Sequence, residues 1–299
     1  MGKLAFVFSG QGDQYPGMGK ELVKKEPAAA EVFAWCDVLR PGTSGQCFDG
    51  TKEELKETKN TQPCLYALEL AGAAALMQKG VVPDCAAGFS LGEIAAAAVS
   101  GLFDSRTGFL LVCRRAELMQ REAQKQDTFM AAVLKLSEEK TEEICGRFRS
   151  VYPVNYNCPG QISVSGGGAE KKEFLEAVKE AGGRAVVLNV SGAFHSPFME
   201  QAAKDFEAEL KNVPFQETKI RLYSDLTAKP YEGDPARLLS QQICSPVRWG
   251  RLIRNMVLDG TDTFVEIGPG RTLANMIRKI SPDAAVFSME EYLAEVEGC

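Results

Sequence analysis

The fold is decided by one stretch of sequence, Cys85-Ala-Ala-Gly-Phe-Ser-Leu-Gly-Glu-Ile-Ala-Ala-Ala-Ala-Val-Ser100. Its first part, Cys85 to Phe89, is a short apolar run of the kind that forms a buried strand. The alanine-rich part, Leu91 to Ser100, indicates a helix that follows the strand directly. A strand that leads straight into a helix is the repeating unit of an α/β protein with a mainly parallel sheet.

The same alternation continues on both sides of this stretch. Further strands are expected at 4–8, 219–223 and 263–267, and helices at 31–39, 62–79, 107–123, 198–210, 252–258 and 272–280. A chain of 299 residues is long enough for two domains at about 150 residues each. We therefore expect an α/β protein with more than one structural unit.

The middle of the chain has a different pattern, with elements in the order β-α-β-β-α-β. The expected ranges are 130–136, 138–148, 152–156, 161–165, 171–180 and 184–190. This order is typical of the ferredoxin-like fold. We expect residues 127–191 to form a small inserted subdomain, and residues 1–126 and 192–299 to form one large, discontinuous α/β catalytic subdomain.

Composition excludes several classes of protein. Lys and Arg number 34 against 40 Asp and Glu, a net charge of −6, which argues against a nucleic-acid-binding protein. The nine cysteines are scattered without a CxxC pair, so neither a disulfide framework nor a structural metal site is expected. No apolar stretch is long enough to span a membrane. We expect a cytoplasmic protein with reduced thiols and no membrane partner.

Ser90 is the first candidate catalytic residue. It lies in Gly88-Phe-Ser-Leu-Gly92, between an expected strand and an expected helix, which is the setting of a nucleophile elbow. The helix N-terminus stabilises negative charge, and the Leu91 N–H would face a developing oxyanion. The short motif also occurs by chance, so the expected strand before it and the expected helix after it are what favour a nucleophile elbow.

A nucleophilic serine needs a base, and the chain has a single histidine, His195. It lies in Ser191-Gly-Ala-Phe-His-Ser-Pro197, a loop between an expected strand and helix. A lone histidine is often structural, but an elbow serine elsewhere in the chain favours a catalytic role. Activity should then fall below about pH 6.5, where imidazole ordinarily protonates. More than 100 residues follow His195, unlike the C-terminal histidine of the α/β-hydrolases.

Arg115 is the third candidate. On the helix expected at 107–123 its neighbours three and four positions away are apolar, whereas those of Arg114 include Glu117. A buried arginine needs an anion, which could be a structural carboxylate or a substrate. The planar guanidinium binds a carboxylate through two parallel hydrogen bonds.

Taken together, the motifs resemble those of the malonyl-CoA:acyl carrier protein transacylase family, the acyltransferases of fatty acid synthesis, and the acyltransferase domains of polyketide synthases. The resemblance spans nearly the whole chain. The matching segments are Phe8-Ser-Gly-Gln-Gly-Asp-Gln14, Gly88-Phe-Ser-Leu-Gly-Glu93, Arg115-Ala-Glu-Leu-Met-Gln120, Asn157-Cys-Pro-Gly-Gln161, Gly192-Ala-Phe-His-Ser-Pro197, Gln242-Ile-Cys-Ser-Pro-Val-Arg-Trp249 and Glu266-Ile-Gly-Pro-Gly270.

The resemblance implies a fold, in which an α/β-hydrolase-like large subdomain carries a ferredoxin-like insertion, and a role for each site residue. Ser90 would be the nucleophile and His195 its base. The backbone N–H groups of Gln11 and Leu91 would form the oxyanion hole. The backbone carbonyl of Gln242 would orient the imidazole.

The resemblance also implies how the acyl group is recognised. Arg115 would bind the malonyl carboxylate. Phe194 would mark a malonyl-selective member, because a rigid ring beside the α-carbon leaves no room for a methyl branch. The chain departs from the family at Phe89, where the family usually has histidine, and this leaves the fine positioning of the elbow open.

We expect a monomeric enzyme that transfers malonyl from malonyl-CoA to acyl carrier protein by a ping-pong route, without metal or cofactor. A thioesterase or esterase using the same Ser–His pair is the first alternative, and an inactive carrier-binding scaffold is the second. Carrier proteins are acidic, so a basic docking surface is expected. The candidates for it are Arg248, Arg251 and Arg254, or Lys171 and Lys172.

Overall fold

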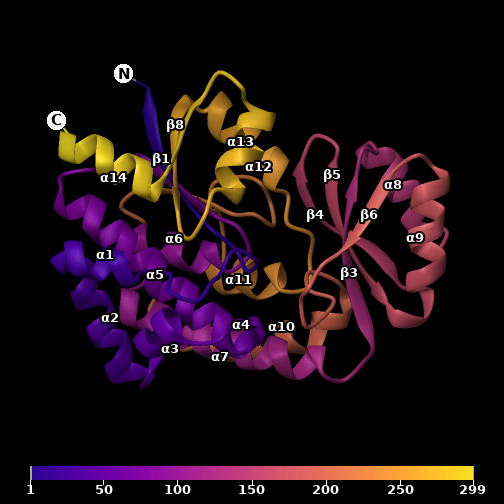
Figure 1. The fold of residues 1–299 in the computed structure, drawn as a ribbon, viewed down its shortest axis with the longest axis horizontal. Coiled ribbons are helices and arrows are strands. Elements are labelled where there is room, and N and C mark those ends of the chain that lie inside the picture. The colour runs from indigo at the N-terminus through magenta and orange to yellow at the C-terminus, as the bar shows by residue number, and fades with distance from the viewer. Residues whose placement is uncertain (1, 299) are drawn as a thin grey trace.

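A computed structural model describes residues 2–298 as two α/β units, each built on its own sheet (Figure 1). The larger sheet has five parallel strands in the order β7-β2-β1-β8-β9. They are β1 (Lys3–Phe8), β2 (Cys85–Gly88), β7 (Arg221–Tyr223), β8 (Thr261–Ile267) and β9 (Ala285–Ser288). The expected parallel sheet is thereby confirmed.

Helices cover both faces of this sheet. Those before the small unit are α1 (Lys20–Lys25), α2 (Pro27–Leu39), α3 (Thr43–Asp49), α4 (Lys52–Lys56), α5 (Thr58–Gln78), α6 (Gly92–Val99) and α7 (Ser105–Ala123). Those after it are α10 (Glu200–Leu210), α11 (Pro235–Gln242), α12 (Trp249–Leu258), α13 (Thr272–Ile280) and α14 (Met289–Gly298). No helix within residues 2–298 has the length and apolar character of a membrane span.

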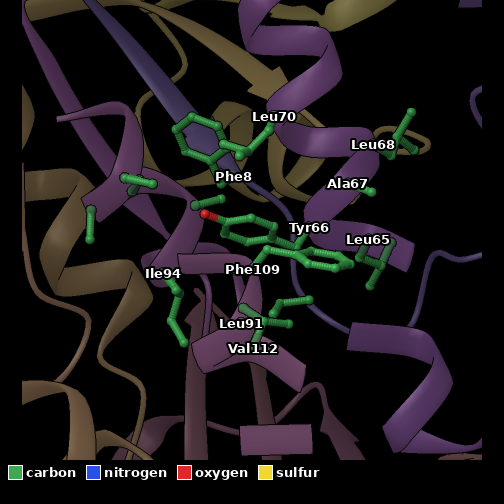
Figure 2. Packing of buried hydrophobic residues seen from close by; sticks show 14 of the residues in the cluster. Phe8, Leu65, Tyr66, Ala67, Leu68, Leu70, Leu91, Ile94, Phe109 and Val112 are labelled. Carbon is green, nitrogen blue, oxygen red and sulfur yellow. The ribbon is translucent and has the colours of Figure 1, made fainter. Parts of the chain in front are cut away.

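The central strand β1 holds the two faces together, because its side chains alternate between them. Phe6 and Phe8 pack into the cluster formed with α5, α6 and α7, whereas Ala5 and Val7 pack into the cluster formed with α12 and α13. Figure 2 shows part of the first cluster, with Phe8 of β1, Tyr66 of α5 and Phe109 of α7 among its labelled side chains. This double burial fixes the end of β1, and the loop that follows it leads into the site.

The smaller unit has the predicted β-α-β-β-α-β order. Its elements are β3 (Thr128–Leu134), α8 (Glu138–Cys145), β4 (Val151–Cys158), β5 (Gln161–Gly167), α9 (Lys171–Glu180) and β6 (Arg184–Val187). The sheet is antiparallel in the order β4-β5-β3-β6, which is the ferredoxin-like arrangement, and Figure 1 places α8 and α9 together on its outer side. The fold class is confirmed, while the boundaries at 126–127 and 191–192 stay predictions.

Several short elements were not predicted, namely α1, α3, α4, α11, β9 and α14. The ends of most strands also differ by a few residues from those expected, and two examples follow. The strand expected at 184–190 ends at Val187, and β4 continues to Cys158 into the expected turn. Pairing with neighbouring strands sets these ends, and the local sequence pattern does not contain that information.

Candidate active site

Ser90 lies on the turn between β2 and α6, with a positive φ of 55°. The two flanking glycines permit this turn. A Cβ at Gly88 would lie 1.9 Å from the carbonyl carbon of Gly92, and a Cβ at Gly92 would lie 2.3 Å from the carbonyl oxygen of Phe8. The strained conformation and the glycines together form the predicted nucleophile elbow.

The structure brings His195 to Ser90 across 105 residues of sequence. The Ser90 Oγ lies 2.7 Å from His195 Nε2, and His195 Nδ1 lies 2.9 Å from the carbonyl oxygen of Gln242. A carbonyl oxygen can only accept a hydrogen bond, so Nδ1 carries the proton and Nε2 is free to accept from the hydroxyl. The geometry expected for the serine, the base and the orienting carbonyl is therefore present.

His195 is buried and lies close to a cation. Burial, together with the positive charge of Arg115, lowers the pKa of His195 to about 4. An ordinary imidazole would protonate near pH 6.5. His195 therefore stays neutral, and able to accept a proton, at pH values well below the 6.5 expected from the sequence.

Arg115 of α7 is fully buried, as its apolar neighbours on the helix predicted. Its Nη2 donates to Ser90 Oγ at 3.1 Å and to Gln242 Oε1 at 2.8 Å, and its Nη1 donates to Gln62 Oε1 at 2.9 Å. Its Nε is buried without a partner in the described part of the chain. Burial lowers the pKa of Arg115 to about 10, so the group stays charged at neutral pH.

The neighbouring Arg114 behaves differently. Its side chain is exposed and forms ion pairs with Glu117 and Glu209. Arg115 makes its three hydrogen bonds to neutral oxygens and has no carboxylate within ion-pair distance among residues 2–298. A buried guanidinium with an unused donor next to a nucleophile is suited to binding a substrate anion.

The two expected oxyanion donors flank the elbow. Leu91 follows Ser90 directly, and Gln11 lies in the loop after β1, where a Cβ at Gly10 would touch the Phe89 ring at 2.8 Å. Within residues 2–298, neither backbone N–H donates a hydrogen bond to the protein. Both are available for an oxyanion.

Two buried carboxyl groups support the elbow from beneath, and sequence analysis did not single them out. Asp225 Oδ2 accepts the Ser90 N–H at 2.7 Å, and Glu93 Oε2 accepts the Asp225 N–H at 3.0 Å. Gln242 Nε2 donates to Glu93 at 2.9 Å and to the Ser90 carbonyl at 2.8 Å. Burial and the adjacent Glu93 raise the pKa of Asp225 well above its usual range. The signals that could have found them were Glu93 within the elbow motif and Asp225 at the end of a parallel strand.

The two phenylalanines of interest occupy different surroundings. Phe89 stacks edge-on against Trp249 with ring centroids 5.5 Å apart and lines the main cavity. Phe194 is buried beside His195, and its carbonyl accepts from Ser165 Oγ at 2.8 Å. Aromatic packing thus holds the side chain at position 89, which cannot form a hydrogen bond.

A cavity of about 450 Å³ opens between the two units beside the elbow. Its lining includes Gln11 and Phe89 from the large unit and Asn155, Asn157 and Ser163 from the small one. A cleft with a mixed polar and apolar lining that reaches Phe89, the residue before Ser90, fits a long, flexible substrate arm.

The two candidate docking surfaces lie on separate helices. Arg248, Arg251 and Arg254 are exposed along one side of α12, and Lys172 is exposed at the start of α9 with Lys171 half-buried beside it. Both surfaces stay predictions.

Comparison with known proteins shows which family the chain resembles over nearly its whole length. Residues 5–292 match the model of the acyl transferase domain. The malonyl CoA-acyl carrier protein transacylase of Bacillus subtilis is 35% identical over 289 residues, covering 94% of this chain and 91% of that protein. The crystal structure of the corresponding transacylase from Clostridium perfringens superposes with a TM-score of 0.94 at 33% identity, covering 99% of this chain and 98% of the other. A malonyl-transacylase in complex with a type II polyketide acyl-carrier protein superposes with a TM-score of 0.91 at 30% identity. The match covers 96% of this chain and 94% of the other.

Proposed function

The chain belongs to the acyl transferase family, and from that premise we propose that it transfers the malonyl group of malonyl-CoA to the phosphopantetheine thiol of an acyl carrier protein. The names of the similar proteins support both substrates, and one similar structure holds a malonyl-transacylase against its carrier protein.

The observation that carries this proposal is the contact between Arg115 and Ser90. A fully buried guanidinium lies 3.1 Å from Ser90 Oγ, and its Nε has no hydrogen-bond partner among residues 2–298. An acyl group joined to Ser90 that ends in a carboxylate would place its charge beside this cation. A neutral acyl group would gain nothing from this cation.

The first half-reaction loads the enzyme. His195 Nε2 removes the proton of Ser90, and Oγ attacks the thioester carbonyl carbon. The Gln11 and Leu91 N–H groups hold the oxyanion of the tetrahedral intermediate. The carbon–sulfur bond then breaks, the coenzyme A sulfur takes the proton from His195, and malonyl-Ser90 remains.

The second half-reaction reverses these roles. The carrier thiol enters the cleft, gives its proton to His195 Nε2, and attacks the ester carbonyl carbon. When the ester bond breaks, Ser90 Oγ takes the proton back and the malonyl group leaves as a carrier thioester. The Gln242 carbonyl keeps Nδ1 protonated throughout, so Nε2 performs every proton transfer.

A hydrolase using the same pair is the main alternative, because water could attack the acyl-enzyme. Arg115 argues against an esterase for neutral esters, which would gain nothing from a buried cation. An inactive scaffold is disfavoured because the serine, the base and the cation lie in mutual contact.

The test is to load the enzyme with malonyl-CoA, remove excess substrate, and follow the intact mass in buffer and after adding holo-carrier protein. We expect the malonyl adduct to persist in buffer and to move to the carrier thiol within the mixing time. Rapid loss of the adduct in buffer alone would indicate a hydrolase.

A further inference from the structure

The cleft contains buried acceptors without partners. Within the described residues, Gln11 Oε1, Asn155 Oδ1 and Asn157 Oδ1 are buried and accept no hydrogen bond, and all three residues line the cavity beside Ser90. Buried polar atoms are nearly always paired, so this cavity is built for a ligand that brings hydrogen-bond donors. A pantetheine arm carries two amide N–H groups and therefore meets this requirement.

Two lysines lie at the exposed edge of the same cavity. Lys52 and Lys56 are four residues apart on α4, which places them on one side of the helix, and both line the cavity. Leu55 is buried and anchors the helix against the core. Within residues 2–298 neither lysine forms an ion pair, whereas Lys59 nearby pairs with Glu57 at 2.9 Å.

The start of α5, which directly follows α4, is hydrogen-bonded to the loop after β1. Gln11 Nε2 donates to Thr58 Oγ1, the residue two positions after Lys56, at 3.3 Å. Among the described residues, Asp13 is the one acidic residue that lines the cavity, and its side chain bonds to that of Thr272. The two ammonium groups are therefore the free positive charge at this edge of the cleft.

We propose that Lys52 and Lys56 bind the diphosphate of coenzyme A while the pantetheine arm lies in the cleft. This inference rests on the proposed function. Two ammonium groups match the adjacent phosphates of coenzyme A, whereas the carrier's prosthetic group has a single phosphodiester. The lysines would thus act in the loading step and serve the coenzyme A substrate rather than the carrier.

The experiment compares two thioesters, malonyl-CoA and malonyl-pantetheine, which lacks the phosphates. Loading of Ser90 is measured by quenched flow and intact mass for the wild type, for the single variants Lys52→Met and Lys56→Met, and for the double variant. Lys59→Met is the control, because it removes one charge, as each single variant does, but outside the cavity. For the double variant we expect KM for malonyl-CoA to rise roughly tenfold, with kcat unchanged. Its KM for malonyl-pantetheine should not change, and the malonyl-CoA effect should shrink at high salt.

Three outcomes would overturn the inference. The first is an unchanged KM for malonyl-CoA in the double variant. The second is an equal rise for malonyl-pantetheine, which would indicate a structural role. The third is normal loading with slowed transfer to holo-carrier, which would assign the lysines to the carrier. In contrast, failure of the wild type to load with either thioester would contradict the proposed function itself.

Discussion

Arg115 Nη2 donates a hydrogen bond to Ser90 Oγ at 3.1 Å, so a buried cation touches the same oxygen that His195 contacts at 2.7 Å. One side chain therefore has two effects. It offers a partner for an acyl carboxylate, and its charge lowers the pKa of the base. When the malonyl carboxylate pairs with Arg115, that electrostatic effect on His195 should weaken during turnover.

Replacing Arg115 by alanine should lower the activity on acyl groups that carry a carboxylate and spare the activity on neutral acyl groups. The malonyl carboxylate would lose its buried partner, at a cost of about 3–5 kcal/mol. The kcat/KM for malonyl-CoA should therefore fall roughly 10²–10⁴-fold. Acetyl-CoA never had this interaction and should be unaffected or improved. Arg115→Lys should restore only part of the malonyl activity, because an ammonium cannot form the parallel pair of hydrogen bonds.

The control for this prediction is the melting temperature of Arg115→Ala, together with the charge-matched variant Arg114→Ala on the exposed side of α7. Arg114→Ala should leave both activities unchanged. Equal loss on both acyl groups with a lowered melting temperature would show that Arg115 only stabilises the fold.

The pH at which activity falls on acidification should be unusually low. His195 acts as a base only when neutral, and burial with Arg115 lowers its pKa to about 4, so kcat/KM for malonyl-CoA should stay level from neutrality and fall near that pH. Arg115→Met, assayed with acetyl-CoA, removes the nearby charge and should move the limit to higher pH. Circular dichroism at each pH controls for unfolding. A wild-type limit near 6.5, or no movement in the variant, would contradict the assignment.

Phe194 should control selectivity for the α-carbon substituent. One methyl group is worth only about 1–3 kcal/mol by pocket filling, so a steric clash with the ring has to provide the discrimination. Phe194→Ser should raise kcat/KM for methylmalonyl-CoA relative to malonyl-CoA. An unchanged ratio of the two kcat/KM values would show that Phe194 does not control the α-carbon substituent.

Asp225 should matter as a hydrogen-bond acceptor rather than as a charge. Its Oδ2 accepts the Ser90 N–H at the strained turn, and burial raises its pKa. Asp225→Asn keeps an acceptor oxygen and should retain most activity. Asp225→Ala leaves a buried N–H unpaired, at about 1–3 kcal/mol, and should lower both kcat and the melting temperature. Inactivity of both variants alike would instead indicate that the carboxyl group itself is required.

The turn at Ser90, the candidate base and the buried face of α7 could be predicted from the sequence because these depend on short-range signals. Glycines at 88 and 92 mark a tight turn, a single histidine leaves one choice of base, and helical spacing separates Arg115 from Arg114. The resemblance to the family supplied Gln242, whose backbone carbonyl carries no signal in its side chain.

The support beneath the elbow could not be predicted in the same way. Asp225 lies 135 residues from Ser90, and their contact depends on β7 pairing with β2. The low pKa of His195 likewise depends on burial and on Arg115, which only tertiary structure provides. The short helix α4 lacks a long periodic pattern, so its two cavity-lining lysines also needed the structure.

The central claim is that the malonyl group passes through a covalent ester on Ser90, and intact mass after mixing with malonyl-CoA tests it most directly. Wild-type protein should gain one malonyl group, Ser90→Ala should gain none while keeping its melting temperature, and added holo-carrier should return the wild type to its original mass. A malonyl adduct of normal extent on Ser90→Ala would contradict the account.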